Sequence, residues 1–131
     1  MMTRLDQFLT AWPVRLVRVG QFLLALGIFT WLSLTTQVAS IQTPDTWLHF
    51  VGNLLLFLSA RVAFLELKSP WFILLFVLVY GTSMEILQLL LPSRYFDPVD
   101  LAANWLGVLA GFCFSLLVSW LAKNYINAIS D

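Results

Sequence analysis

The chain has 131 residues, of which 60% are hydrophobic and only 11% are charged, whereas about 25% of the residues in a soluble domain are charged. Seven Lys and Arg residues balance seven Asp and Glu residues, so the net charge is +0 and no basic surface for nucleic acid is indicated. The composition excludes a soluble globular protein, a disordered chain and a nucleic-acid-binding protein. It predicts one all-α integral membrane domain over residues 1–131.

Four apolar segments follow one another along the chain. Each is close to the roughly 20 residues that an α-helix needs to cross a bilayer. We therefore predict a bundle of four transmembrane helices at about residues 16–35, 47–65, 71–91 and 101–122. The connections are short, which favours antiparallel packing of successive helices. Residues 3–12 are expected to form a short helix on the membrane surface, because their apolar side chains recur at helical spacing.

Prolines mark the expected starts of three of these helices. Thr43-Pro44, Ser69-Pro70 and Asp97-Pro98 each place a potential capping residue directly before a proline. Proline is favoured at the first helical position because it has no N–H group to leave unsatisfied and its φ angle is already helical. These pairs predict where the second, third and fourth helices begin.

The distribution of Lys and Arg predicts the orientation of the bundle. Basic residues occur in the N-terminal segment, near the second connection and in the C-terminal tail. The connection over residues 36–46 has none, and the third connection has only Arg94. Both the N and the C terminus are therefore expected to be cytoplasmic. The first apolar segment is expected to remain as a span rather than to be cleaved as a signal peptide.

Polar residues inside apolar segments are costly in a membrane, so their positions carry information. Several share a face of the second helix, and others lie near the end of the third helix and the start of the fourth. In the predicted orientation they gather at the outer end of the bundle, while the inner half is expected to hold almost none. These candidate ligand-binding residues are Asp45, His49, Asn53, Glu85, Gln88, Arg94, Asp97, Asp100 and Asn104. Among them, His49, Asp45 and Glu85 are the candidate catalytic residues.

The charges of this cluster leave three arrangements open. Four carboxylates, of Asp45, Glu85, Asp97 and Asp100, accompany the single arginine Arg94. Either the carboxylates share protons, or a divalent metal ion such as Mg²⁺, Mn²⁺ or Zn²⁺ binds among them, or the ligand itself brings positive charge. No compact metal-binding motif is present in the sequence, so no metal site is assigned from it.

The same residues also have purely structural explanations. Aspartates suit the N-terminus of the fourth helix, and Glu85 with Arg94 would make a buried ion pair. The spacing of Gly107 and Gly111 is typical of close helix packing, either within the chain or between copies in a homo-oligomer. On this hypothesis the cluster is a lock that holds helix ends together.

Two motifs resemble those of the VanZ-like membrane protein family. The first is Asp45-Thr46-Trp47-Leu48-His49-Phe50, in which Thr46 stands where family members often carry a lysine. The second is E-x-x-Q from Glu85 to Gln88, followed by R-x-x-D-x-x-D-x-x-x-N-x-x-G from Arg94 to Gly107. The resemblance covers roughly residues 45–111.

The resemblance implies a small multi-pass protein of the bacterial cytoplasmic membrane. The family's namesake is linked to resistance to the glycopeptide antibiotic teicoplanin, but fold or family alone does not transfer an activity. The favoured hypothesis is a cell-envelope accessory protein that binds the head group of a membrane lipid or a lipid-linked envelope precursor. One alternative is a membrane enzyme acting on an envelope lipid or phosphate substrate, with His49 as a general base oriented by Asp45 and with metal assistance. Another is an ion-coupled transporter subunit.

Overall fold

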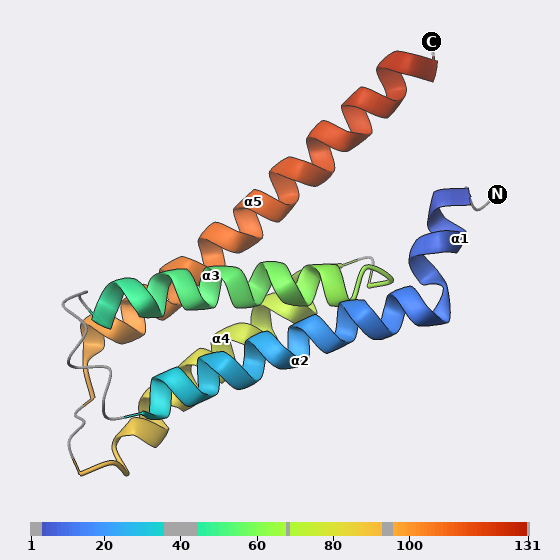
Figure 1. The fold of residues 1–131 in the computed structure, drawn as a ribbon. Helices are drawn as coiled ribbons and strands as arrows, with labels where there is room; N and C mark the ends of the chain where they lie inside the picture. The colour runs from blue at the N-terminus through green and yellow to red at the C-terminus, as the bar shows by residue number, and fades with distance from the viewer. Residues whose placement is uncertain (1–3, 36–44, 68, 93–95, 131) are drawn as a thin grey trace.

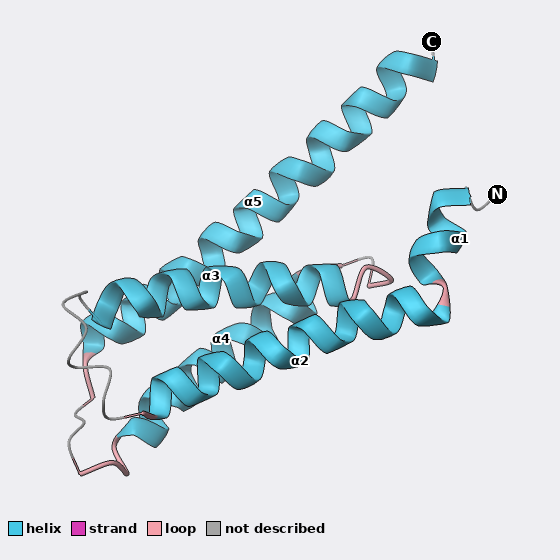
Figure 2. Ribbon diagram, viewed as in Figure 1, coloured by secondary structure: helices cyan, strands magenta, loops and turns pink. Residues whose placement is uncertain are grey.

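The computed structural model describes residues 4–35, 45–67, 69–92 and 96–130. The secondary structure within these ranges is entirely helical (Figure 2). The helices are α1 (Arg4–Thr10), α2 (Trp12–Leu34), α3 (Asp45–Ala63), α4 (Trp71–Gln88) and α5 (Pro98–Ser130). Four of them, α2 to α5, are long and apolar enough to cross a membrane. The prediction of an all-helical chain with four candidate spans is confirmed.

The predicted bounds of the spans need correction at several ends. The first span begins at Trp12 rather than at residue 16, and the second covers residues 45–63 rather than 47–65. The third ends at Gln88 rather than at residue 91, because three successive amides, of residues 89–91, bond to carbonyls three residues earlier in the tight turns before Pro92. The fourth continues from residue 98 to residue 130, well past residue 122. Its polar last part ends the apolar segment but contains no Gly or Pro to end the helix.

The predicted helix starts are confirmed in one case and corrected in another. Asp97 caps α5 as expected, because its Oδ1 accepts a hydrogen bond of 2.8 Å from the amide of Val99. Ser69 does not cap α4, since Pro70 itself is the N-cap residue and its carbonyl accepts from the amide of Leu74. Thr43 and Pro44 lie outside the described residues.

The helices run in alternating directions, so both chain ends lie at one end of the bundle (Figure 1). We call this the Arg18 end; it also holds the end of α3 and the start of α4. The opposite end, which we call the His49 end, holds the ends of α2 and α4 and the starts of α3 and α5. Helix α3 packs against α2, α4 and α5. The last part of α5 extends away from the other helices (Figure 1).

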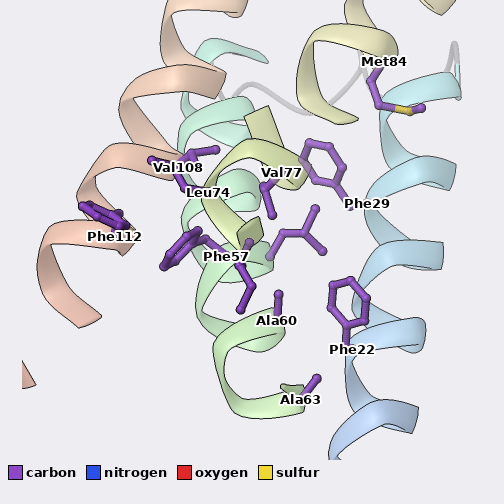
Figure 3. Packing of buried hydrophobic residues seen from close by; sticks show 12 residues of the cluster. Phe22, Phe29, Phe57, Ala60, Ala63, Leu74, Val77, Met84, Val108 and Phe112 are labelled. Carbon is purple, nitrogen blue, oxygen red and sulfur yellow. The ribbon is translucent and has the colours of Figure 1, made fainter. Parts of the chain in front are cut away.

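Aromatic and small apolar side chains fill the space between the helices (Figure 3). Phe22 and Phe29 reach in from α2, and Phe57 of α3 meets Phe112 of α5 edge to face with ring centroids 6.0 Å apart. Many other large apolar side chains point outward, including Leu24, which is 65% exposed. An apolar outer surface is unusual for a soluble monomer and is expected where lipid is the solvent.

Two glycines bring α5 against α3. A Cβ atom on Gly107 would lie only 2.1 Å from the carbonyl oxygen of Phe50, and one on Gly111 would lie 3.1 Å from the ring of Phe57 and 3.2 Å from the carbonyl oxygen of Leu54. The close packing expected of these glycines therefore occurs within the chain. It also brings Asn104, one turn before Gly107, directly to the polar face of α3.

Candidate functional site

His49 is the centre of a buried polar cluster at the His49 end. Its Nδ1 atom lies 3.1 Å from Asn104 Oδ1 and 3.3 Å from Glu85 Oε1, and its Nε2 atom lies 3.8 Å from Asp100 Oδ2. The side chains come from α3, α4 and α5. The sequence predicted that residues far apart along the chain meet here, and for these four residues the structure brings them together.

The neighbours of the imidazole determine where its protons lie. Both groups nearest Nδ1 are oxygen atoms that accept hydrogen bonds, so Nδ1 must carry a hydrogen. The Nε2 atom faces the carboxylate of Asp100, so a second proton there would place a positive charge between two carboxylates. If both carboxylates are ionised, His49, Glu85 and Asp100 together carry one negative charge when His49 is protonated and two when it is neutral.

Two asparagine amides connect the charged groups. Asn104 donates to Glu85 Oε1 at 3.3 Å and to the Gly81 carbonyl at 3.4 Å, while its own oxygen accepts from both His49 and Asn53. Asn53 also donates to the carbonyl of His49 at 3.0 Å. Gly81 lets α4 approach, since a Cβ atom there would lie 2.8 Å from Asn53 Oδ1. The side-chain amides of Asn53 and Asn104 thus connect α3, α4 and α5 at the level of His49.

Burial falls off towards Asp100, which lies at the outer edge of the cluster. Glu85 and Asn53 are 0% exposed and His49 is 3% exposed, whereas Asp100 is 8% exposed. Thr46 Oγ1 donates to Asp100 Oδ1 at 2.6 Å. Thr46 was noted in the sequence only as a departure from the family motif, and the structure shows that it contacts the site directly.

Two of the remaining predicted site residues, Gln88 and Asp97, do not join this cluster. Gln88 is buried, but its amide donates to the Ser33 carbonyl at 2.8 Å and so connects α4 to α2. Asp97 is exposed and caps α5, which confirms its structural explanation. Asp45 begins α3, but its side chain lies outside the described residues, as does the whole of Arg94. The predicted pairs Asp45–His49 and Glu85–Arg94 therefore stay predictions.

A cavity leads to His49 from the side of the bundle. It has a volume of about 210 Å³, lies between α2 and α3, and is lined by Phe29, Ser33, Leu48, His49 and Gly52 among others. Drug-sized ligands occupy roughly 300–1,000 Å³, so this cavity has room for only part of a ligand. A larger cavity of about 550 Å³ lies between α4 and α5; its described lining has no charged side chain and none of the cluster residues.

The donor set does not form a metal centre within the described part of the chain. There, no three His, Cys, Asp or Glu side chains are close enough together to hold a metal ion. Asn104 bonds to both His49 and Glu85, and Asn53 bonds to Asn104 and to the backbone carbonyl of His49.

A second polar group lies at the Arg18 end, where almost no polar residues were expected. Arg18 is only 6% exposed; it donates to the carbonyls of Val62 and Ala63 at 3.0 and 3.3 Å and pairs with Glu66. The hydrogen bond from Arg18 lowers the pKa of the Glu66 carboxyl below its ordinary value of 4.5. This group was missed because the first helix was expected to begin at residue 16, which would leave Arg18 at the membrane surface.

The comparisons with known proteins give one match. The family model for VanZ/LLP1 matches residues 7–119, a range that includes the whole polar cluster and all but the final part of α5. No curated protein and no solved structure matches the chain.

Proposed function

The chain belongs to the VanZ/LLP1 family, and from this premise we propose that it is a cell-envelope accessory protein that binds the polar head group of a membrane lipid or a lipid-linked precursor. The proposed site is the polar cluster around His49 together with the cavity between α2 and α3 that His49 borders. The proposed location is the bacterial cytoplasmic membrane, with both termini on the cytoplasmic side. The His49 end would then face outward.

The distribution of charge supports this orientation. Arg15, Arg18, Arg61 and Lys123 all lie towards the end of the bundle that also holds both chain termini. The described part of the His49 end has acidic residues and no Lys or Arg. Basic residues are retained on the cytoplasmic side of membranes, so the Arg18 end is the better candidate for that side.

One observation carries the proposal: the imidazole of His49 both borders the cavity between α2 and α3 and lies between the carboxylates of Glu85 and Asp100. Ionisable groups at membrane depth are costly, so a buried trio of them is more often functional than incidental. The described lining of the cavity is apolar apart from His49 and Ser33. An amphiphilic ligand would fit this combination, with a polar group at the trio and an apolar part in the cavity.

The charge of the trio indicates which head groups suit it. Glu85 and Asp100 exceed the single positive charge that His49 can carry. A bare anion would be repelled by this excess, whereas a group with N–H or O–H donors would be attracted. We therefore propose a head group rich in donors, such as an amine, an amide or sugar hydroxyls.

The burial of His49 favours binding over catalysis. A general base needs a ring nitrogen within hydrogen-bond reach of a substrate proton. Asn104 and Glu85 engage Nδ1, and Nε2, the nitrogen left for a substrate, belongs to a side chain that is only 3% exposed. Proton relay for a transporter would need polar groups along the whole bundle. Between His49 and the Arg18 end, however, the helices pack through the apolar core.

Native mass spectrometry of the protein released in mild detergent tests the proposal. Wild type is compared with Asp100→Asn, which removes one negative charge at the outer edge of the site. Asp97→Asn is the matched control, because it makes the same chemical change three residues away, at an exposed position where asparagine also caps a helix.

We expect a lipid-mass adduct on wild type and on Asp97→Asn, and a loss of about tenfold or more in its occupancy on Asp100→Asn. The unfolding midpoints of the three proteins should be close. Equal adducts on all three proteins, or adduct loss only in step with unfolding, would mean that the cluster is a structural lock.

A further inference from the structure

A third cavity opens between α3 and α5 at the Arg18 end, where α5 leaves the bundle (Figure 1). Its volume is about 380 Å³. Beyond Phe112 every described residue of α5 is exposed except Ser115, which is half-buried. The lining includes Leu58, Arg61 and Val62 on one side and Phe114, Ser115 and Ser119 on the other. We call this cavity the α3–α5 wedge.

Among the described residues, Arg61 is the only charged side chain in the lining of the wedge, and its guanidinium is poorly satisfied. Its Nη1 atom donates to the Leu67 carbonyl at 3.4 Å, a long contact. Its Nε atom is buried and has no hydrogen-bond partner among the described residues. Arg18 also has a buried Nε atom without a partner, but its terminal nitrogens bond to two carbonyls and to the Glu66 carboxylate. No described carboxylate forms an ion pair with Arg61.

The position of Arg61 in the last turn of α3 has a structural explanation, because a positive charge is favourable at a helix C-terminus. That explanation leaves the buried Nε atom without an acceptor. A buried donor without an acceptor is unfavourable, and a guanidinium matches the geometry of a phosphate group. Arg61 therefore has N–H donors left for a ligand with oxygen acceptors.

The rest of the wedge selects a ligand with an apolar part. The hydroxyls of Ser115 and Ser119 both bond at 2.8 Å to carbonyls of their own helix, so they offer little to a ligand. Leu58, Val62 and Phe114 make the remaining surface apolar. The volume falls within the roughly 300–1,000 Å³ of ligand sites, enough for part of an acyl chain.

From this combination we infer that the α3–α5 wedge binds one anionic phospholipid, with its phosphate at Arg61 and an acyl chain against α5. Basic pockets between transmembrane helices are suited to anionic head groups on the cytoplasmic side. The wedge lies at the opposite end of the bundle from the His49 cluster and carries the opposite charge. Lipid binding in the wedge is therefore independent of any ligand at the His49 cluster.

Lipid titration followed by native mass spectrometry tests the inference, with phosphatidylglycerol as the anionic probe and phosphatidylethanolamine as the zwitterionic one. Wild type should bind phosphatidylglycerol about tenfold more tightly than phosphatidylethanolamine. Arg61→Gln should lose this preference. Arg15→Gln is the matched control, because it removes a charge from an exposed position at the same end, and it should keep the preference.

An unchanged preference in Arg61→Gln, or an equal loss in Arg15→Gln, would overturn the inference. Ser119→Leu provides a test that keeps all charges. By filling the wedge it should weaken the binding of both lipids and leave the unfolding midpoint unchanged. Undiminished lipid binding in Ser119→Leu would also contradict the inference. Inorganic phosphate should not displace the lipid, and displacement at millimolar phosphate would show that the site takes a free anion instead.

Discussion

At the His49 end, ionisable side chains from three helices are buried against one another, whereas at the Arg18 end a buried arginine bonds to backbone carbonyls and to the carboxylate of Glu66 in a turn. Arg18 needs no second buried charge, because the end of α3 supplies neutral acceptors. His49, Glu85 and Asp100 depend on each other. The comparison indicates that the two ends respond very differently to the loss of one side chain.

The largest expected effect is at the His49 end. His49→Leu removes the group between Glu85 and Asp100, and a buried charge left uncompensated costs roughly 3–5 kcal/mol. A lost interhelical hydrogen bond alone would cost only about 0.6 kcal/mol on average in a membrane protein. The free energy of unfolding, measured by denaturing-detergent titration in mixed micelles, separates the two outcomes.

His49→Gln is the matched comparison, since glutamine keeps a hydrogen-bond donor towards Asn104. It should lose clearly less stability than His49→Leu. A cost near 0.6 kcal/mol for His49→Leu would instead mean that the carboxylates are protonated and that the cluster is held by neutral hydrogen bonds.

An intermediate effect is expected at the packing contact beneath the cluster. Gly107→Ala places a Cβ atom 2.1 Å from the Phe50 carbonyl oxygen, so α3 and α5 must separate, at a cost of about 1–3 kcal/mol or more. Gly20→Ala is the control, because nothing lies within 4 Å of a Cβ atom there; it should be neutral or stabilise α2 by up to about 1 kcal/mol. Equal stabilities for the two variants, by thermal unfolding in detergent, would contradict the helix contact.

The smallest effect is expected at the Arg18 end. The lowered pKa of Glu66 means that its carboxylate stabilises the folded state above the ordinary pKa of 4.5, and that this contribution is lost as pH falls through the lower folded value. Because the side chain of Glu66 is 37% exposed, the contribution should be below about 1 kcal/mol. Unfolding free energies of wild type and Glu66→Gln should therefore converge from about pH 6 to pH 3. A difference in unfolding free energy that widens at low pH would contradict the pairing of Arg18 with Glu66.

Much of this protein is determined locally along the chain. The four spans follow from runs of apolar residues, because a helix in a membrane must be apolar over the length of the bilayer. The Asp97 cap follows from a side chain adjacent in sequence to the amides that it binds. The meeting of His49, Glu85, Asp100 and Asn104 was also predictable, because polar residues in a membrane must find one another.

Only the tertiary structure decided which polar residues share a contact and how closed the site is. Gln88 turns to Ser33 and away from His49 because α2 packs beside α4, and no periodicity within α4 contains that information. Arg18 is buried because the end of α3 presents two carbonyls to it, a partner 44 residues away along the chain. Sequence patterns report the cost of exposing a group to lipid, whereas the partner that removes that cost depends on how the helices pack.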